Sequence, residues 1–318
     1  MSSNPSRCSV SGQAAFVDLP ANWKLRVLPT ADDLAAESTY LIETITCDLA
    51  RRPSTADSAT GDDAAPVPSL RKLHLALSGG STPKKIYESF ARTYFFKQVL
   101  DKKAELNLWY GDVRMVPDAH ADSNARMVTT ALDGSFPDNV IHAVDVAAPA
   151  AEAAAKYAAQ MLELMPTTDV GGVAVPVFDI LLLGMGPDGH TASLFPGTDA
   201  PAARDAVCVT CMPGPDVKPR VERVTVTAPV IEAAKHVVLI AAGAEKKEAF
   251  RGLVASDAAL AEHKEWLRPV IRLLRGCKGA VHLLVDKAIA EGCFRSKCHP
   301  VDNNVIEATT GADNGAAA

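Results

Sequence analysis

Short apolar runs recur along the chain at intervals that are typical of buried strands. Residues 23–28 (WKLRVL) alternate apolar and polar side chains, as a strand with one buried face does. The runs at 178–184 (FDILLLG) and 236–243 (HVVLIAAG) are apolar without alternation, which is typical of strands buried on both faces of a parallel sheet. Further strands are predicted at residues 73–77, 106–110, 223–227 and 280–286.

The intervals between these runs carry helical patterns. Thr30 is a predicted N-cap, and apolar residues follow it at helical spacing as far as Leu49. Other helices are predicted at residues 82–96, 123–132, 149–164 and 244–254. Strands that alternate with helices predict an α/β fold, with a doubly wound, mostly parallel sheet and helices on both faces in a Rossmann-like arrangement. Because ligands of such sheets bind beyond the carboxyl ends of the strands, the loops that follow strands are the informative ones.

Composition marks the segments that depart from this regular pattern. Residues 51–69 are rich in Pro, Ser, Asp and Ala, and such a segment buries little apolar area, so it is predicted to be a surface insertion. Residues 1–20 and 299–318 are expected to be disordered tails. Residues 21–298 are then expected to form one catalytic α/β domain that carries the insertion.

Charge and hydropathy exclude some function classes. The 318 residues are 48% hydrophobic and 22% charged, which is an ordinary globular composition. A formal net charge of −6 gives no overall attraction for nucleic acid or for an anionic membrane, so no nucleic-acid or membrane partner is expected. No apolar stretch approaches the ~20 residues of a membrane span, and the first residues lack the apolar core of a secretory signal. The expected location is cytoplasmic.

The seven cysteines are an odd number, scattered along the chain, and free thiols in a reducing compartment explain them most simply. Two groups offer an alternative as metal ligands, namely Cys208 with Cys211, and Cys293 with Cys298 and His299. The second group does not have the spacing of a standard zinc site, and the two groups lie far apart in the sequence. No metal and no cofactor are therefore predicted.

The loop after the strand at 73–77 has the composition of a phosphate site. In its sequence, SGGSTPKKIYE (78–88), Gly79 and Gly80 leave backbone amides bare, and Ser81 and Thr82 add hydroxyls. Because Pro suits the first turn of a helix, the loop is expected to open into a helix N-terminus, which attracts anions. The alternative is a tight turn with an ordinary N-cap.

Two further strand ends carry candidate phosphate-binding cations. Arg114 and Asp112 follow the strand at 106–110. An arginine can make bidentate hydrogen bonds to phosphate oxygens, and a carboxylate can accept from sugar hydroxyls. Lys246 falls in the first turn of the helix after residue 243, where a bound phosphate would offset its unfavourable interaction with the helix dipole. Arg220 and Arg223 are weaker candidates. The alternative for Asp112 and Arg114 is a surface ion pair, and the alternative for Lys246 is a solvated surface lysine.

The loop after the strand at 178–184, GMGPDGHTASLFPG, carries the candidate catalytic residues. His190 can take up and return a proton near neutral pH, and Asp188 can face the same cavity from a glycine loop. Amides at glycines such as Gly186 can meet negative charge that develops on an oxygen. A structural histidine is the alternative.

Four motifs follow one another along the chain, namely SGGSTP, GDVRMVPDAHADSN, GMGPDGHTASLFPG and GAEKKEAF. In this order they closely resemble the 6-phosphogluconolactonase family over residues 23–292. The wider superfamily includes glucosamine-6-phosphate deaminases, which tend to carry Asn-Glu-Pro where this chain has SLFPG. The resemblance implies hydrolysis of 6-phospho-D-glucono-1,5-lactone to 6-phosphogluconate in the oxidative pentose phosphate pathway, by a metal-independent carboxylic ester hydrolase. It assigns acid/base catalysis to His190, with Asp188 as its orienting partner. Substrate and phosphate binding are expected from Gly79, Gly80, Ser81, Thr82, Asp112, Arg114, Gly186, Arg223 and Lys246.

The expected partner is thus a small sugar phosphate, and the expected assembly is a monomer or weak homodimer. Two positions depart from the family pattern: Val113 replaces the usual Glu of Asp-Glu-Arg, and Ala125 stands where a Tyr is frequent. An aldose–ketose deaminase would need further acidic groups near the histidine loop, and Phe195 and Pro196 supply none. A catalytically silent sugar-phosphate sensor remains the other alternative, against which the retained Asp188 and His190 argue.

Overall fold

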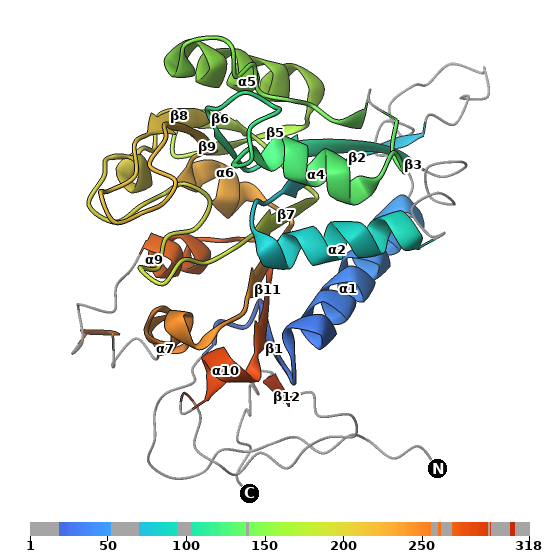
Figure 1. Ribbon diagram of the computed structural model, residues 1–318, viewed down its shortest axis with the longest axis vertical. Helices are drawn as coiled ribbons and strands as arrows, with labels where there is room; N and C mark the ends of the chain where they lie inside the picture. Colours follow the sequence, from blue (N-terminus) through green and yellow to red (C-terminus); the bar gives the residue numbers. More distant parts are fainter. Residues whose placement is uncertain are drawn as a thin grey trace, which may run out of the picture.

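The computed structural model describes residues 19–51, 70–93, 104–137, 140–255, 260–261, 269–291, 293 and 306–308. Its centre is a sheet in which the described strands have the order β12-β1-β11-β10-β7-β2-β3 (Figure 1). The neighbours pair in parallel except β12, which is antiparallel to β1. The strands are β1 (Trp23–Leu28), β2 (Arg71–Leu77), β3 (Ala104–Tyr110), β7 (Ile180–Leu183), β10 (His236–Ala241), β11 (Ala280–Asp286) and β12 (Ile306–Ala308).

The chain reverses its direction of travel across the sheet between β2 and β7. From β2 it proceeds to β3 at one side, then returns to β7 on the other side of β2 and continues to β10 and β11. This is the switch point of a doubly wound sheet, where the loops leaving two neighbouring strands diverge and open a crevice. The predicted fold class is confirmed, and the glycine loop after β2 and the histidine loop after β7 flank this crevice.

Helices cover both faces of the sheet. α1 (Ala31–Arg51), α2 (Ser81–Arg92) and α4 (Asn124–Leu132) pack together on one face, and α6 (Ala228–Ala233), α7 (Lys247–Val254) and α9 (Pro269–Arg275) lie on the other (Figure 1). α5 (Ala150–Leu164) and the short α10 (Lys287–Ala290) are further helices of the described residues. Thr30 caps α1 as predicted, since its Oγ1 accepts from the amide of Asp33 and donates to the Asp33 carboxylate.

A smaller antiparallel sheet lies beside the crevice, with the order β4-β9-β8. It consists of β4 (Asp112–Arg114), β9 (Arg223–Val226) and β8 (Cys208–Cys211). The strand predicted at 223–227 is β9, and it pairs with β4 and β8 rather than with a strand of the central sheet. A separate hairpin joins β5 (Thr167–Val170) to β6 (Val173–Pro176). None of these short strands except β9 is evident in the hydrophobic pattern.

Some predictions fall partly outside the described residues. The helix predicted at 82–96 begins at Ser81 and ends at Arg92, and residues 94–96 are among those that the structure does not describe. The insertion (beyond Arg51) and residues 1–18 also lie outside the described ranges. Within the segment 299–318, expected to be disordered, Ile306–Ala308 forms β12. The helix predicted at 244–254 is a 3₁₀ turn, Ala244–Lys246, followed by α7.

The core lies between the sheet and its helices. Trp23, Trp109, Phe178 and Phe250 are fully buried there, together with nearly all residues of β7 and β10. Burial of such side chains on both faces explains why these strands show no alternation. Among the described residues, no helix is both long and apolar enough to cross a membrane.

Candidate active site

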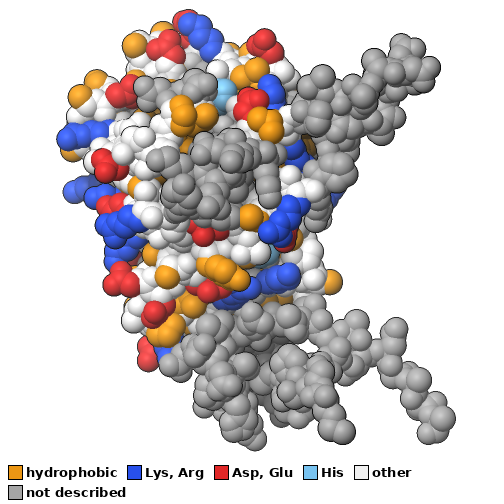
Figure 2. Space-filling view, turned by 90° about the vertical axis from the view of Figure 1, so that its right-hand side faces the viewer, with side chains coloured by type: hydrophobic (Ala, Val, Ile, Leu, Met, Phe, Trp, Pro, Cys, Tyr) orange, Lys and Arg blue, Asp and Glu red, His pale blue; other side chains and the backbone are white. Residues whose placement is uncertain are grey.

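A cavity of about 290 Å³ opens where the carboxyl ends of β2, β7 and β10 face the small sheet. Every predicted site residue except Asp188 lines it. The shared lining residues are Gly79, Gly80, Ser81, Thr82, Asp112, Arg114, Gly186, His190, Arg223 and Lys246. On the face of the molecule in Figure 2, basic and acidic side chains are interspersed. In the cavity basic residues gather, since Arg114, Lys218, Arg223 and Lys246 line it.

The glycine loop after β2 presents a free helix end to the cavity. α2 begins at Ser81 and no side chain caps its N-terminus, which leaves first-turn amides pointing at the cavity. Gly80 has φ +116°, a conformation that an L side chain rarely adopts, so glycine is required for the turn. Tyr87 holds the start of the loop in place, because its hydroxyl donates to the carbonyl of Ser78 (2.8 Å) and accepts from the amide of Ser78 (2.9 Å).

Two arginines lie opposite one another on the small sheet. Arg114 of β4 is the register partner of Arg223 of β9, and both line the cavity. Like charges in directly opposite positions destabilise a strand pair, and a bound anion between them reverses that effect. Burial lowers the pKa of Arg223, and the positive charge of Arg114 lowers it further, while Asp112 acts in the opposite direction.

The two arginines are held differently. Arg223 is buried, and its guanidinium donates to the carbonyls of Val221 (3.1 Å) and Pro219 (2.8 Å), which fixes the loop before β9. Arg114 is more exposed and donates to the carbonyl of Asp122 (3.1 Å). Arg223 therefore shapes the cavity wall as well as contributing charge.

Lys246 closes the cavity from the end of the 3₁₀ turn after β10. Burial lowers the pKa of its ammonium group, and the nearby carboxylates of Glu245 and Asp286 oppose this effect. A desolvated cation of this kind gains most from an anionic ligand, because the ligand replaces lost solvation.

The histidine loop places a proton-transfer pair at the cavity. The Nδ1 of His190 is 2.5 Å from the Oδ1 of Asp188, which also accepts from the amide of His190 (3.1 Å). When Nδ1–H donates to this carboxylate, Nε2 is left free to accept a proton. Burial raises the pKa of Asp188, but hydrogen bonds and charge attraction from His190 outweigh burial, so its pKa is lowered overall and the carboxylate stays ionised.

Gly186 has a steric role that the sequence did not indicate. A Cβ at this position would lie 2.2 Å from the Cε1 and Nδ1 atoms of His190, so the ring packs directly on the bare backbone. The amide of Gly186 donates to the carbonyl of His190 (2.9 Å), and it is therefore not free to bind an oxyanion.

Two residues that the sequence analysis did not single out connect the parts of the site. Asn124 donates from Nδ2 to the carbonyl of Asp112 (2.7 Å), and its Oδ1 accepts from the amide of Arg114 (3.1 Å). Ser193 donates from Oγ to the Asp112 carboxylate (2.7 Å). Asn124 bonds residues 10 and 12 positions earlier in the same loop, whereas the partner of Ser193 is 81 residues away, and the composition of neither loop reveals these contacts.

The remaining sequence candidates lie away from the cavity lining. Arg220 is exposed and is not among the lining residues. Val113, the departure from the family pattern, is buried in the core, because successive residues of β4 face opposite sides and only Asp112 and Arg114 face the cavity. Ala125 packs against the core.

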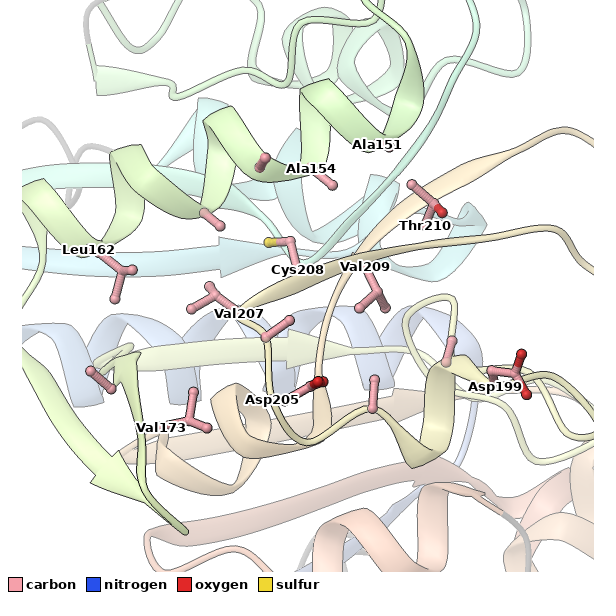
Figure 3. Close-up of a pocket in the computed structure, with 16 residues that line it drawn as sticks. Ala151, Ala154, Leu162, Val173, Asp199, Asp205, Val207, Cys208, Val209 and Thr210 are labelled. Carbon is pink, nitrogen blue, oxygen red and sulfur yellow. The ribbon is translucent and has the colours of Figure 1, made fainter.

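A second hollow, of about 650 Å³, lies between α5 and β8 (Figure 3). Small apolar side chains line it, among them Ala151 and Ala154 of α5 and Cys208 and Val209, with the carboxylates of Asp199 and Asp205 at its margin. No basic residue is among its lining residues, so it does not suit a phosphate. Cys208 is a thiol, since burial raises its pKa to about 12. Within the described residues no cluster of potential metal ligands is present, and Cys298 and His299 lie outside them.

Comparison with known proteins identifies the family to which this geometry belongs. Residues 57–279 match the family described as glucosamine-6-phosphate isomerases/6-phosphogluconolactonase. The chain belongs to this family. The match spans the glycine loop, the β4–β9 arginine pair, the histidine loop and Lys246, so it covers every residue of the cavity that we have assigned.

Individual family members extend the likeness. A 6-phosphogluconolactonase of a Nostoc species is 40% identical over 207 residues, 64% of this chain and 80% of the relative. The solved structure of 6-phosphogluconolactonase from Trypanosoma brucei is 36% identical with a TM-score of 0.70, and the match covers 84% of this chain and 97% of that chain. The corresponding structure from Trypanosoma cruzi is 32% identical with a TM-score of 0.71, covering 86% and 98%.

Proposed function

We propose that the protein hydrolyses 6-phospho-D-glucono-1,5-lactone to 6-phosphogluconate, with His190 as the acid/base. The observation that carries this proposal is that His190, paired with Asp188 through Nδ1, lines the same cavity as Arg114, Arg223, Lys246 and the uncapped N-terminus of α2. The relatives named as 6-phosphogluconolactonases support the choice of a phosphorylated lactone as substrate.

The phosphate binds at the cationic end of the cavity. Arg114, Arg223 and Lys246 supply charge, and the first-turn amides of α2 with the hydroxyls of Ser81 and Thr82 supply hydrogen bonds. A phosphate monoester carries about −1.5 to −2 charges at pH 7, so binding energy is concentrated there and orients the lactone ring. Asp112 faces the same cavity and accepts from a sugar hydroxyl.

Hydrolysis then proceeds by proton transfer at one histidine. The Nε2 of His190 removes a proton from a water molecule, and the resulting hydroxide attacks the carbonyl carbon of the lactone. This attack gives a tetrahedral intermediate, whose oxyanion requires hydrogen-bond donors near the carbonyl carbon. When the intermediate collapses, the bond between the carbonyl carbon and the ring oxygen breaks, and the ring oxygen receives the proton held by His190. Asp188 keeps the imidazole in one tautomer and stabilises its protonated form.

The deaminase alternative finds no support in the surroundings of the histidine. Phe195 is buried against the His190 ring, with ring centroids 4.4 Å apart, in the segment where the deaminases carry an acidic residue. An aldose–ketose isomerisation would need a second acid/base group at that place.

The test is an assay of the purified protein with freshly generated lactone, which follows acid release above the spontaneous rate. Wild type is expected to accelerate hydrolysis. The His190→Ala variant is expected to lose at least ~100-fold in kcat, since general acid–base catalysis contributes about 10²–10⁴-fold, while its affinity for 6-phosphogluconate by calorimetry is retained. A His190→Ala variant with wild-type turnover would remove this residue from the mechanism, and an inactive wild type would refute the proposed reaction.

A further inference from the structure

Ser193 joins the two halves of the candidate active site. Its Oγ donates to the carboxylate of Asp112 on β4 (2.7 Å), and its amide donates to the Oγ1 of Thr225 on β9 (3.2 Å). Asp112 and Thr225 are register partners, so one residue of the histidine loop is bonded to both strands of the arginine-bearing pair. Ser193 is fully buried and does not line the cavity, so its hydroxyl is not available to a ligand.

The segment that carries Ser193 is fixed at both ends. Thr191, also fully buried, donates from Oγ1 to the carbonyl of Gly184 (2.8 Å), which ties the segment to the end of β7. Ala192, between the two anchors, has φ +48° and lies in the left-handed region. A residue other than glycine holds this conformation only when its surroundings enforce it, so the two anchors keep the segment under strain.

This arrangement matters because the two halves belong to different sheets. His190 is attached to the central sheet through β7, whereas Arg114 and Arg223 are attached to the small sheet. The distance between the imidazole and the arginine pair decides where the reacting carbon lies once the phosphate is bound. A misplacement of about 1 Å can reduce a rate by ~10²-fold.

We propose that Ser193 is a positioning residue that fixes the proton-transfer loop relative to the anion-binding strand pair. The inference rests on the proposed function for its kinetic readout. Loss of the hydroxyl leaves the phosphate contacts in place but loosens the placement of His190, so kcat falls while KM and product affinity change little. Asn124 differs from Ser193, because it joins β4 to the glycine loop and not to the histidine loop. It bonds the backbone of β4 and packs on Gly79. Its loss displaces Arg114 and raises KM.

The experiment compares Ser193→Ala and Ser193→Cys with the control Thr198→Ala. The thiol fills the space of the hydroxyl but is a weak donor. Thr198 lies five residues further along, and its hydroxyl donates to the carbonyl of Phe195 (2.9 Å) and accepts from the Sγ of Cys211 on β8 (3.6 Å), so it bonds neither Asp112 nor Thr225. We expect kcat to fall about 10- to 100-fold for Ser193→Ala and less for Ser193→Cys, with KM within threefold of wild type and Thr198→Ala unchanged. Asn124→Ser is expected to raise KM.

A double variant tests whether Ser193 acts through Asp112. If it does, kcat of Ser193→Ala with Asp112→Ala equals that of Asp112→Ala alone, because the second change removes a bond that is already lost. A raised KM with unchanged kcat for Ser193→Ala, or additive losses of kcat, would overturn the proposal.

A crystal structure of Ser193→Ala separates this inference from the proposed reaction. Displacement of residues 190–193 away from β4 supports the positioning role, even if the wild-type protein fails to hydrolyse the lactone. An unmoved loop in the variant would refute the positioning role, even if hydrolysis by the wild type is confirmed.

Discussion

At the scale of single residues, the contact between Gly186 and His190 decides whether the candidate base can occupy its place. The imidazole ring rests on the bare backbone of Gly186, and Asp188 holds the ring by its Nδ1 atom. The glycine therefore contributes space, and the aspartate contributes orientation.

Replacement of Gly186 by alanine tests this steric requirement. The added Cβ would lie 2.2 Å from His190 and 2.6 Å from the Asp188 carboxylate, so both side chains must move. We expect kcat to fall at least ~10-fold, because displacement of a catalytic base by up to about 1 Å is enough to slow the reaction. The affinity for 6-phosphogluconate is expected to change little. Gly214→Ala is the matched control, because a Cβ there meets nothing within 4 Å. Wild-type kcat in Gly186→Ala would show that the ring does not need this position.

At the scale of elements, the β4–β9 strand pair and the turn after β10 form one anion site from segments that are remote in sequence. Register places Arg114 opposite Arg223, and the cavity brings Lys246 to the same space. Cations brought together in this way repel one another until an anion binds.

Removal of one cation is expected to affect binding more than chemistry. Arg114→Met or Lys246→Met should weaken 6-phosphogluconate binding by roughly 1.5–3 kcal/mol each, the typical contribution of a charged hydrogen bond. KM rises more than kcat falls, because these contacts exist in ground and transition states alike. The double variant should be non-additive, since both side chains bind one phosphate.

Calorimetry and steady-state kinetics measure these effects. Lys72→Met is the control, because Lys72 pairs with Glu105 near the opposite end of β2. A phosphate found beside His190 in a crystal soaked with 6-phosphogluconate, with Arg114 and Lys246 facing solvent, would reverse the proposed orientation of the substrate.

The elements also show which features the sequence could predict. The central strands β7 and β10 were predicted within a few residues, because long apolar runs and a following glycine are local signals. β4 has only three residues, and its partner β9 lies more than a hundred residues further on, so its pairing has no local signal. The candidate residues could be chosen from loop composition, but Asn124 and Ser193 gain their roles only from tertiary contacts.

At the scale of the whole molecule, two histidines are enclosed in the sheet, away from the cavity. His74 of β2 accepts from the indole of Trp109 (3.1 Å), and His282 of β11 lies beside His236. Burial lowers the pKa of each to about 4, from an ordinary value of 6.5. Both are therefore neutral in the folded protein at neutral pH.

Acid is expected to destabilise the fold through these histidines. The unfolded chain takes up protons on them near pH 6.5, whereas the folded chain does so only near pH 4, so stability falls as pH decreases between these values. For each histidine, the free energy of unfolding is roughly 3 kcal/mol lower below pH 4 than at neutral pH. Thermal unfolding followed by circular dichroism at pH 7, 5.5 and 4.5 measures the loss.

His74→Gln should reduce this pH dependence, because glutamine can accept from Trp109 without titrating. His120→Gln is the control, since His120 is an exposed loop residue. If the Tm of His74→Gln depends on pH as that of wild type does, His74 does not contribute to acid sensitivity.

The order of strands in the central sheet has a consequence for biosynthesis. β1 pairs with β11 and β12, so the earliest of the described strands to leave the ribosome has only late partners among them. The roughly 250 residues between Trp23 and its partner Val281 take on the order of 10–50 s to translate at ~5–20 residues per second. During that interval β2, β3, β7 and β10 can associate, but β1 has two open edges. A nascent chain interrupted before β11 is therefore an aggregation hazard even when its candidate active-site loops are complete.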